Sequence, residues 1–273
     1  MAELVLTYKG SGGSRIPLEA EAITPDNLRG KERGGIERLT LFHGNAKVPL
    51  GDAFEVKGEP SDRLRVLGDL ALVKGLGQGM TGGRLVIEGN AGMHVGARMS
   101  GGTIEVRGGA ADWAGAEMTG GLIWIKGDAG NRAGSAYRGS KFGMRGGVIL
   151  VEGSAGHEVG GYMRRGLIAV RGDVQDFAGA RMSAGTIFVL GRAGIRTGGG
   201  MKRGTIVCYQ APEVLPTFRA AGSFEPLFVT IYLRALAARG FDVGRFEAKH
   251  SFARYRGDLA ELGKGELLVA QPG

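Results

Sequence analysis

Short stretches of alternating apolar and polar residues recur through the middle of the chain, each five residues long and flanked by glycines. The second and fourth positions of each stretch are apolar, which is typical of a β-strand with one buried face. The apolar pairs are Leu85/Ile87, Ile104/Val106, Ile123/Ile125, Ile149/Val151, Ile168/Val170, Ile187/Val189 and Ile206/Cys208. The pattern therefore predicts a row of short strands between residues 84 and 209.

These strands follow one another with a fixed period. A methionine precedes each strand, and the steps between methionines are 19 residues except for one step of 26. A unit of this length is too short for a strand plus a crossover helix, but it fits one coil of a parallel β-solenoid. We therefore expect an all-β fold, a right-handed parallel β-helix with about 19 residues per coil. The methionines are Met80, Met99, Met118, Met144, Met163, Met182 and Met201.

Glycines stand three, nine and sixteen residues after most of these methionines. A phosphate-binding glycine loop occurs once in a chain and opens a helix, whereas these glycines recur and open strands. Tight turns with positive φ and close backbone stacking both favour glycine, so we interpret the glycines as structural. Small residues fifteen positions after each methionine are expected to line a second wall of the core: Val95, Ala114, Ala133, Val159, Ala178 and Thr197.

The two ends of the chain depart from the period. Residues 1–79 are expected to form irregular first coils and a cap, residues 80–209 the regular β-helix, and residues 210–273 a C-terminal helix and an extended arm. The stretch 225–240 predicts the helix, with Pro226 in its first turn and Gly240 just past its end. Its apolar residues, among them Leu227, Ile231 and Leu236, are expected to plug or flank the last coil as a capping helix.

Outward-facing strand positions are also apolar, at Trp124, Leu150, Phe188 and Val207. A monomer seldom leaves such a strip in contact with water. The strip therefore predicts an interface with another protein chain.

The composition indicates the kind of partner and the cellular compartment. The formal charge is +8 and the pI about 9.8, so the surface attracts polyanions. Aromatic residues make up 7% and are not interleaved with basic runs, which speaks against a nucleic-acid partner. The single cysteine favours a reducing compartment, and neither a secretory signal nor a run of about 20 apolar residues is visible. We expect a cytoplasmic protein with no membrane contact.

The longer step in the period is a seven-residue insertion after Gly134, within SAYRGSKFG. Insertions in repeat proteins form surface loops, often on a binding face. In the stacked frame, like charges at equal offsets lie ~4.8 Å apart, which is unfavourable unless an anion or an acidic partner lies across them. The alternative is a basic rim that faces solvent. The residues concerned are Tyr137, Arg138 and Lys141 of the insertion, with Arg145, Arg164, Arg165, Lys202 and Arg203 nearby.

Catalytic patterns are not apparent. The histidines His43, His94, His157 and His250 fall at unrelated offsets and are not spaced as metal ligands. Cys208 replaces Ile or Val in an inward ladder, so we expect a core thiol. The residues therefore predict a structural subunit of a larger assembly, with no catalytic or metal site of its own.

The units MSGGTIEVRGGAADWAGAEM and MRRGLIAVRGDVQDFAGARM resemble the glycine-repeat β-helix domain at the C-terminus of the large glutamate synthase polypeptide. They resemble the C subunit of formylmethanofuran dehydrogenases more closely, and EVLPTF (213–218) and RYRGDLAELGKGE (254–266) resemble the C-terminal region of that protein. Within this family, the Ala- and Arg-rich composition is more similar to the branch found in the formyltransferase/hydrolase complex of methylotrophs. A glutamate synthase domain is disfavoured because it is fused to a much larger chain.

The resemblance implies a non-catalytic subunit of a complex in one-carbon metabolism and formaldehyde oxidation. That complex transfers a formyl group from formyl-tetrahydromethanopterin to a methanofuran-type carrier and hydrolyses it to formate, with catalysis on other subunits. The alternative is the C subunit of a dehydrogenase whose tungsten or molybdenum pterin lies on another polypeptide. We further hypothesise that a basic set holds the carrier's polyglutamyl tail. The set is Tyr137, Arg138, Lys141, Arg145, Arg164 and Arg165.

Overall fold

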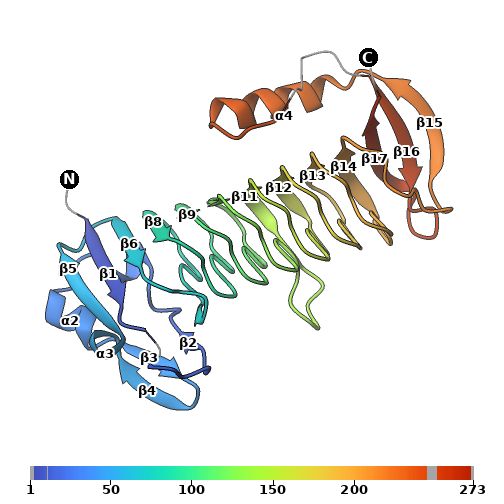
Figure 1. Cartoon of the computed structure of the whole chain (residues 1–273). Helices are drawn as coiled ribbons and strands as arrows, with labels where there is room; N and C mark the ends of the chain where they lie inside the picture. The colour runs from blue at the N-terminus through green and yellow to red at the C-terminus, as the bar shows by residue number, and fades with distance from the viewer. Residues whose placement is uncertain (1–2, 11, 245–250, 272–273) are drawn as a thin grey trace.

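The computed structural model describes residues 3–10, 12–244 and 251–271, and strands dominate it (Figure 1). The strands before the regular repeats are β1 (Leu4–Tyr8), β2 (Leu18–Glu19), β3 (Thr40–His43), β4 (Ala46–Pro49), β5 (Phe54–Gly58), β6 (Arg63–Leu67) and β7 (Val73–Lys74). Those of the repeats are β8 (Arg84–Glu88), β9 (Thr103–Val106), β10 (Leu122–Ile125), β11 (Arg145–Val151), β12 (Arg165–Val170), β13 (Thr186–Val189) and β14 (Arg203–Cys208). The tail adds β15 (Arg219–Phe224), β16 (Phe252–Gly257) and β17 (Lys264–Ala270). The helices are α1 (Pro25–Leu28), α2 (Arg33–Glu37), α3 (Leu50–Ala53) and α4 (Leu227–Ala238).

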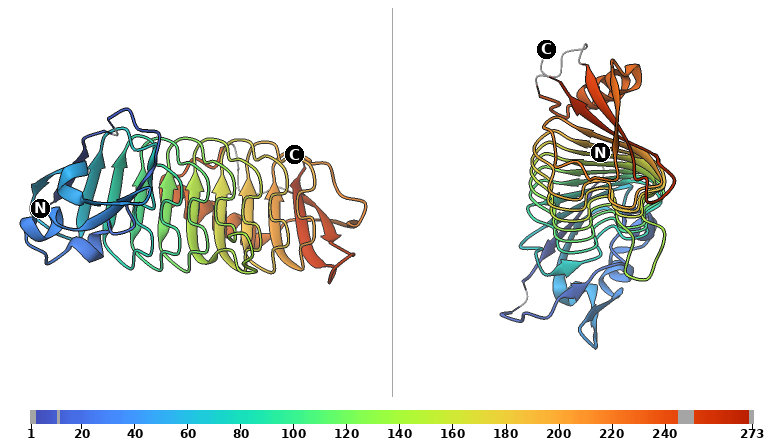
Figure 2. Two further views of the ribbon diagram at one scale, coloured as in Figure 1. Left: turned by 90° about the horizontal axis from the view of Figure 1, so that it is seen from below. Right: turned by 90° about the vertical axis from the view of Figure 1, so that its right-hand side faces the viewer.

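Strands of successive repeats pair in parallel within one 13-stranded sheet of the described chain. Ile104 of β9 is in register with Leu85 of β8 and with Ile123 of β10, so equivalent residues of neighbouring repeats lie side by side. A second line of parallel bridges joins Ala91 to Ala110 and onward through the later repeats. Figure 2 shows the result as coils of chain stacked along one axis. The prediction of a mostly β chain built on the repeat is confirmed.

The core fills the space inside these coils. The inward strand pairs and the methionines are fully buried, and the small residues fifteen positions after each methionine are buried as well, as expected. Cys208 continues the ladder as a buried thiol, and its burial raises the pKa of that thiol to about 12. Like side chains therefore stack on like side chains through the repeats.

Gly147 shows why the repeat needs glycine at the start of each strand. Its φ is +89°, and a Cβ added there would lie 2.6 Å from Met118 Cε and 2.8 Å from the Gly121 carbonyl oxygen. Gly147 is therefore required for two reasons: its backbone is left-handed, and the preceding coil leaves no room for a Cβ.

Side chains also tie each coil to the next. The Asp112 carboxylate accepts a hydrogen bond from the Asn131 backbone N–H at 2.8 Å, and the Asn131 amide oxygen accepts one from the His157 N–H at 2.9 Å. Asp176 repeats the arrangement with the Ile195 N–H at 3.0 Å. Short polar side chains at this corner therefore satisfy backbone donors that the strand ladder leaves free.

The N-terminal region joins the sheet in a different order from the sequence. β1 lies between β6, to which it is parallel, and β5, to which it is antiparallel. A separate four-stranded sheet runs in the order β4-β3-β2-β7.

The C-terminal helix is present as α4, and through Leu236 it flanks the coils, but it does not plug their end as a cap. Leu227 and Ile231 are exposed, and α4 lies along the outside of the sheet and not across its end (Figure 1). The last coil is continued instead by β17, which pairs in parallel with β14, and then by antiparallel β16 and β15. The expected extended arm is therefore a strand pair of the main sheet.

The outward apolar strip is not the interface with another chain that the sequence predicts. Leu150, Phe188 and Val207 are fully buried because Val229, Leu233 and Leu236 of α4 pack on them. Trp124 is partly buried at the margin of the same cluster. The chain covers this surface with its own helix.

Candidate functional site

Exposed cations stand at the starts of β11, β12, β14 and β17, interrupted at the coil of β13, which carries Ser183 and Ala184 there. Arg145 of β11 is in register with Arg165 of β12, and Arg203 of β14 is in register with Lys264 of β17. Arg164 and Lys202 immediately precede two of these positions. We refer to Arg145, Arg164, Arg165, Lys202, Arg203 and Lys264 as the cationic strip; all six are exposed.

Charges on the earlier coils are neutralised locally. Arg65 pairs with Glu3 at 3.1 Å, Arg84 with Glu105 at 2.6 Å, and Arg107 with Glu88 at 2.9 Å. The glutamates of these pairs are only partly exposed.

The cationic strip differs from this arrangement. Lys202 reaches Glu261 at 3.8 Å, whereas Arg145, Arg165 and Arg203 have no ion pair or side-chain hydrogen bond with any residue that the structure describes. Neighbouring strands are ~4.8 Å apart, so like charges in register repel one another. The strip is therefore a place where an anionic group would be stabilised.

The insertion loop is linked to this strip. The Arg164 guanidinium lies over the Phe142 ring, 4.1 Å from its centroid. Arg138 and Lys141 are exposed on the same loop and extend its positive charge. All six residues that the sequence singled out thus lie on the strip or on the loop in contact with it, and five of them are exposed cations.

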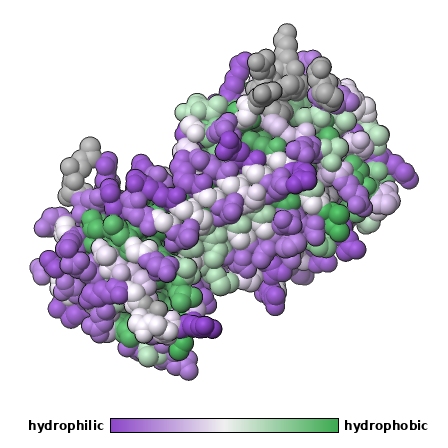
Figure 3. Space-filling view, viewed as in Figure 1, coloured by the Kyte–Doolittle hydropathy of each residue, from purple (hydrophilic) through white to green (hydrophobic). Residues whose placement is uncertain are grey.

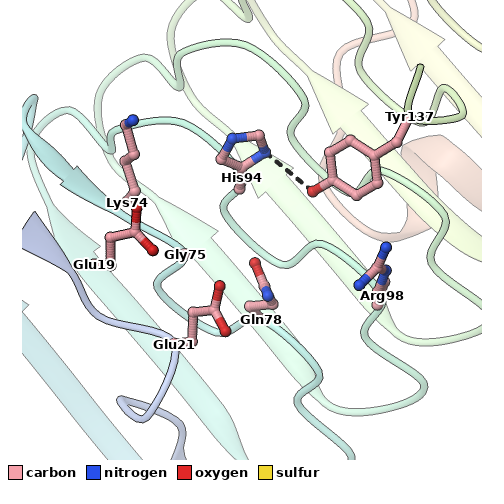
Figure 4. A pocket seen from close by; sticks show the side chains of 8 residues that line it. All are labelled: Glu19, Glu21, Lys74, Gly75, Gln78, His94, Arg98 and Tyr137. Atoms are coloured by element: carbon pink, nitrogen blue, oxygen red, sulfur yellow. Dashed lines mark hydrogen bonds between the residues drawn. The ribbon is translucent and has the colours of Figure 1, made fainter. Parts of the chain in front are cut away.

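Tyr137 points elsewhere. Its hydroxyl is 3.0 Å from His94 Nδ1, and the Arg98 guanidinium lies over its ring at 5.2 Å (Figure 4). Its backbone N–H donates to Glu117 at 3.3 Å. The insertion therefore folds back across an earlier coil and anchors its first residues there.

The corner that receives Tyr137 has unusual backbone geometry. His94, Trp113 and Arg132 stand fourteen residues after successive methionines, and all have positive φ, between 61° and 66°. The shared conformation stacks their side chains: His94 and Trp113 lie 5.4 Å apart at 23°, and Arg132 lies 5.3 Å from the Trp113 ring. The coil imposes a conformation that is seldom adopted by bulky residues.

A hollow of about 320 Å³ opens beside this corner, with Tyr137, His94 and Arg98 on its wall. The N-terminal region supplies the acidic residues Glu19 and Glu21. Lys74, Gly75 and Gln78 complete the lining. Apart from Tyr137, the lining residues were not predicted, although the shared offset of His94 and Trp113 is a signal that could have pointed to this corner.

Burial shifts the acid–base behaviour of this cluster. Desolvation raises the pKa of Tyr137 to about 12. Desolvation, followed by the nearby Lys74 ammonium, lowers the pKa of His94. Burial opposes ionisation of Glu117, but hydrogen bonds from Ser140, Arg98 and the Tyr137 N–H outweigh it, and the pKa of Glu117 is lowered. The tyrosine and histidine are thus neutral at pH 7 and the glutamate is ionised.

Replacing His94 with Asn is expected to flatten the pH dependence of stability below neutrality. The folded state disfavours the imidazolium, so His94 contributes fully above its unfolded pKa of ~6.5, and the contribution is lost as the pH falls through the lowered folded pKa. Asn tolerates positive φ. Thermal unfolding from about pH 7.5 to 5.5 measures the difference. His157→Asn is the control, and parallel curves for wild type and His94→Asn would contradict the assignment.

Clusters of potential metal ligands do not occur within residues 3–10, 12–244 and 251–271, where no group of three or more His, Cys, Asp or Glu side chains could hold a metal ion. In the same ranges, none of the helices has the length and apolar character needed to cross a membrane.

Comparison with known proteins identifies relatives of this chain. No family model matches it. It is 45% identical over 102 residues to the C subunit of the tungsten-containing formylmethanofuran dehydrogenase 2 of Methanothermobacter wolfeii, covering 36% of this chain and 37% of the relative. It is 41% identical over 100 residues to the C subunit of the molybdenum-containing formylmethanofuran dehydrogenase 1 of Methanosarcina barkeri, covering 35% and 33%. The chain thus spans about a third of the length of these curated relatives.

A solved structure extends the similarity to the whole chain. A chain in the crystal structure of the formyltransferase/hydrolase complex from Methylorubrum extorquens, in complex with methylofuran, is 36% identical with a TM-score of 0.91. The match covers 98% of this chain and 100% of that one. The stacked glycine-rich repeats, with the cationic strip on their outer surface, are those of a repeat protein. The chain belongs to the family of formylmethanofuran dehydrogenase C subunits, and the resemblance noted from the sequence is confirmed.

Proposed function

We propose that this chain is the C subunit of a formyltransferase/hydrolase complex. The complex would transfer a formyl group from formyl-tetrahydromethanopterin to a methanofuran-type carrier and hydrolyse it to formate. The observation that carries the proposal is the match, over nearly the whole length of both chains, to a component of the complex crystallised with methylofuran. The carrier would belong to the complex, in a cytoplasmic pathway of formaldehyde oxidation.

Within that complex the chain acts as a scaffold. Its coils are filled by apolar side chains, so the outer faces are what it offers to neighbouring subunits. In this proposal the repeats wind as a right-handed β-helix over residues 80–209. Residues 1–79 and 210–273 close its two ends.

Affinity purification of the full chain from its native host tests this assignment. Formyltransferase and hydrolase subunits are expected to co-purify in fixed proportion. Recovery of a chain carrying a tungsten or molybdenum pterin would instead assign the dehydrogenase, which the 45% identity to its C subunit makes the second candidate. Recovery of the chain alone, active on a substrate, would contradict both.

The cationic strip and the insertion loop provide the proposed contact for the carrier's polyglutamyl tail. Arg138, Lys141, Arg145, Arg164 and Arg165 are exposed cations, and successive carboxylates of a flexible polyanion would neutralise them. Tyr137 would position the loop through its contacts with His94 and Glu117.

Replacing Arg138, Arg164 and Arg165 together with Ala is expected to weaken the affinity of the complex for the carrier by about tenfold or more, equivalent to about 1.4 kcal/mol. The carrier should therefore be lost from purified complex. The carrier retained after gel filtration is measured by mass spectrometry at low and high salt. Arg15→Ala with Arg29→Ala removes exposed charge from the N-terminal region and is the control. Unchanged carrier content in the triple variant would show that the strip serves another purpose.

A further inference from the structure

Helix α4 buries only one of its faces. Val229, Leu233 and Leu236 pack on the outer face of the sheet, in a cluster separate from the core inside the coils. The opposite stripe begins with Leu227 and Ile231, which are 73% and 60% exposed, and continues through Arg234 and Ala238. Hydrophobic residues are visible at the surface in the region of α4 in Figure 3.

The composition of α4 is unusual for a helix that faces water. Arg234 is the only charged residue among its twelve, and Tyr232 is a further exposed apolar side chain beside Ile231. Helices that are apolar on all sides are normally buried on all sides. The exposed stripe therefore indicates a second packing partner.

A groove of about 580 Å³ runs beside this stripe, between α4 and the first residues of β11, β12 and β13. Ile231, Tyr232 and Ala235 lie on its helical wall. Its floor combines strand-opening glycines with Val148, Leu167 and Thr186. Among the residues that the structure describes, the lining contains the charged residues Arg165 and Arg239 and no acidic side chain. An apolar surface thus adjoins positive charge that no described carboxylate pairs with.

We infer that the α4 stripe and this groove dock an acidic, amphipathic segment of a neighbouring subunit. Apolar side chains of the segment would cover Leu227 and Ile231, while a carboxylate would pair with Arg239, because Arg165 belongs to the proposed carrier contact. The inference rests on the proposed function, because it requires that the chain be part of a complex.

Two features favour this occupant over others. A polyanionic tail would satisfy the arginines but leave the apolar stripe exposed. A second copy docked through the same face would bring Arg165 and Arg239 against their own counterparts, and like charges across an interface are unfavourable.

Ile231→Asp in the full complex is the decisive variant. The side chain is 60% exposed, so the chain is expected to fold with an unchanged melting temperature while its retention of the docked subunit falls by roughly tenfold or more. Ile16→Asp, at an isoleucine that is 52% exposed in the N-terminal region, is the matched control. Charge reversal of Arg239 is expected to weaken binding of the same subunit, most strongly at low salt.

A photo-crosslinking residue at position 231 identifies the occupant. Capture of a peptide of another subunit, rich in Asp or Glu beside the crosslink, is the expected result. Capture of the same chain would overturn the inference in favour of a dimer, and full retention of every subunit by Ile231→Asp would overturn it outright. Failure of the proposed function gives a different outcome, because wild type would then purify without partners or with a pterin-carrying subunit.

Discussion

Gly147→Ala is expected to lower the free energy of unfolding by about 3–5 kcal/mol, because it combines left-handed backbone strain with overpacking. A methyl group there meets Met118 Cε at 2.6 Å and the Gly121 carbonyl oxygen at 2.8 Å. The methionine tip can move, but the backbone of the adjacent coil cannot do so without breaking its register. Chemical denaturation measures the loss, and the melting temperature should fall by roughly 2–4 °C per kcal/mol.

Gly139→Ala separates the two causes. Gly139 has a φ of +85°, close to that of Gly147, but a Cβ added there has nothing within 4 Å. The control therefore carries the backbone strain alone, about 1 kcal/mol. Equal losses in the two variants would mean that close stacking between coils contributes nothing.

Leu236→Asp is expected to detach α4 from the sheet. Leu236 is 1% exposed and packs in the cluster that covers Phe188 and Leu150, so the substitution removes apolar contacts and buries an unpaired carboxylate. We expect a loss of about 3–5 kcal/mol from the docking of the helix. The coils should survive because their core is a separate cluster.

Limited proteolysis and dye binding measure this change. Cleavage within α4 should accelerate, and the uncovered strip should bind a hydrophobic dye and promote self-association. Ala238→Asp, on the exposed side of the same helix, is the control. A Leu236→Asp chain that resists protease as well as wild type would contradict the role assigned to α4.

The regular coils could be predicted because their information is local and repeated. Alternation at pairs such as Ile149 and Val151, and glycine at fixed offsets, specify strand, register and buried face together. Each repeat confirms the phase of the next. The residues that fill the interior of the coils could therefore be predicted from the sequence.

The position of α4 could not be predicted in the same way. With one charged residue in the helix, Val229 and Ile231 look alike in sequence, although one is buried and the other exposed. The covering of Phe188 depends on a contact between distant segments, which no local pattern encodes.

The candidate site shows the same division. Stacked offsets place Arg145 beside Arg164, whereas a register shift between β11 and β12 sets Arg145 opposite Arg165. The direction of Tyr137 depends on a loop that crosses one coil to reach another. The coil imposes the shared backbone conformation of His94, Trp113 and Arg132, whatever their side chains. The three residues therefore differ in chemical type, and no common residue type marks this corner in the sequence.

The reversed strands at both ends of the main sheet determine how long the molecule can become. β5 at one end and β15 and β16 at the other run against their neighbours, whereas every junction between regular repeats is parallel. Another copy arriving at either end meets a strand of the wrong polarity to continue the repeat, with Arg219 and Gly222 along the outermost edge. Continuation of the parallel stack by another copy is thereby discouraged, and the number of coils in one chain sets the length of the rod.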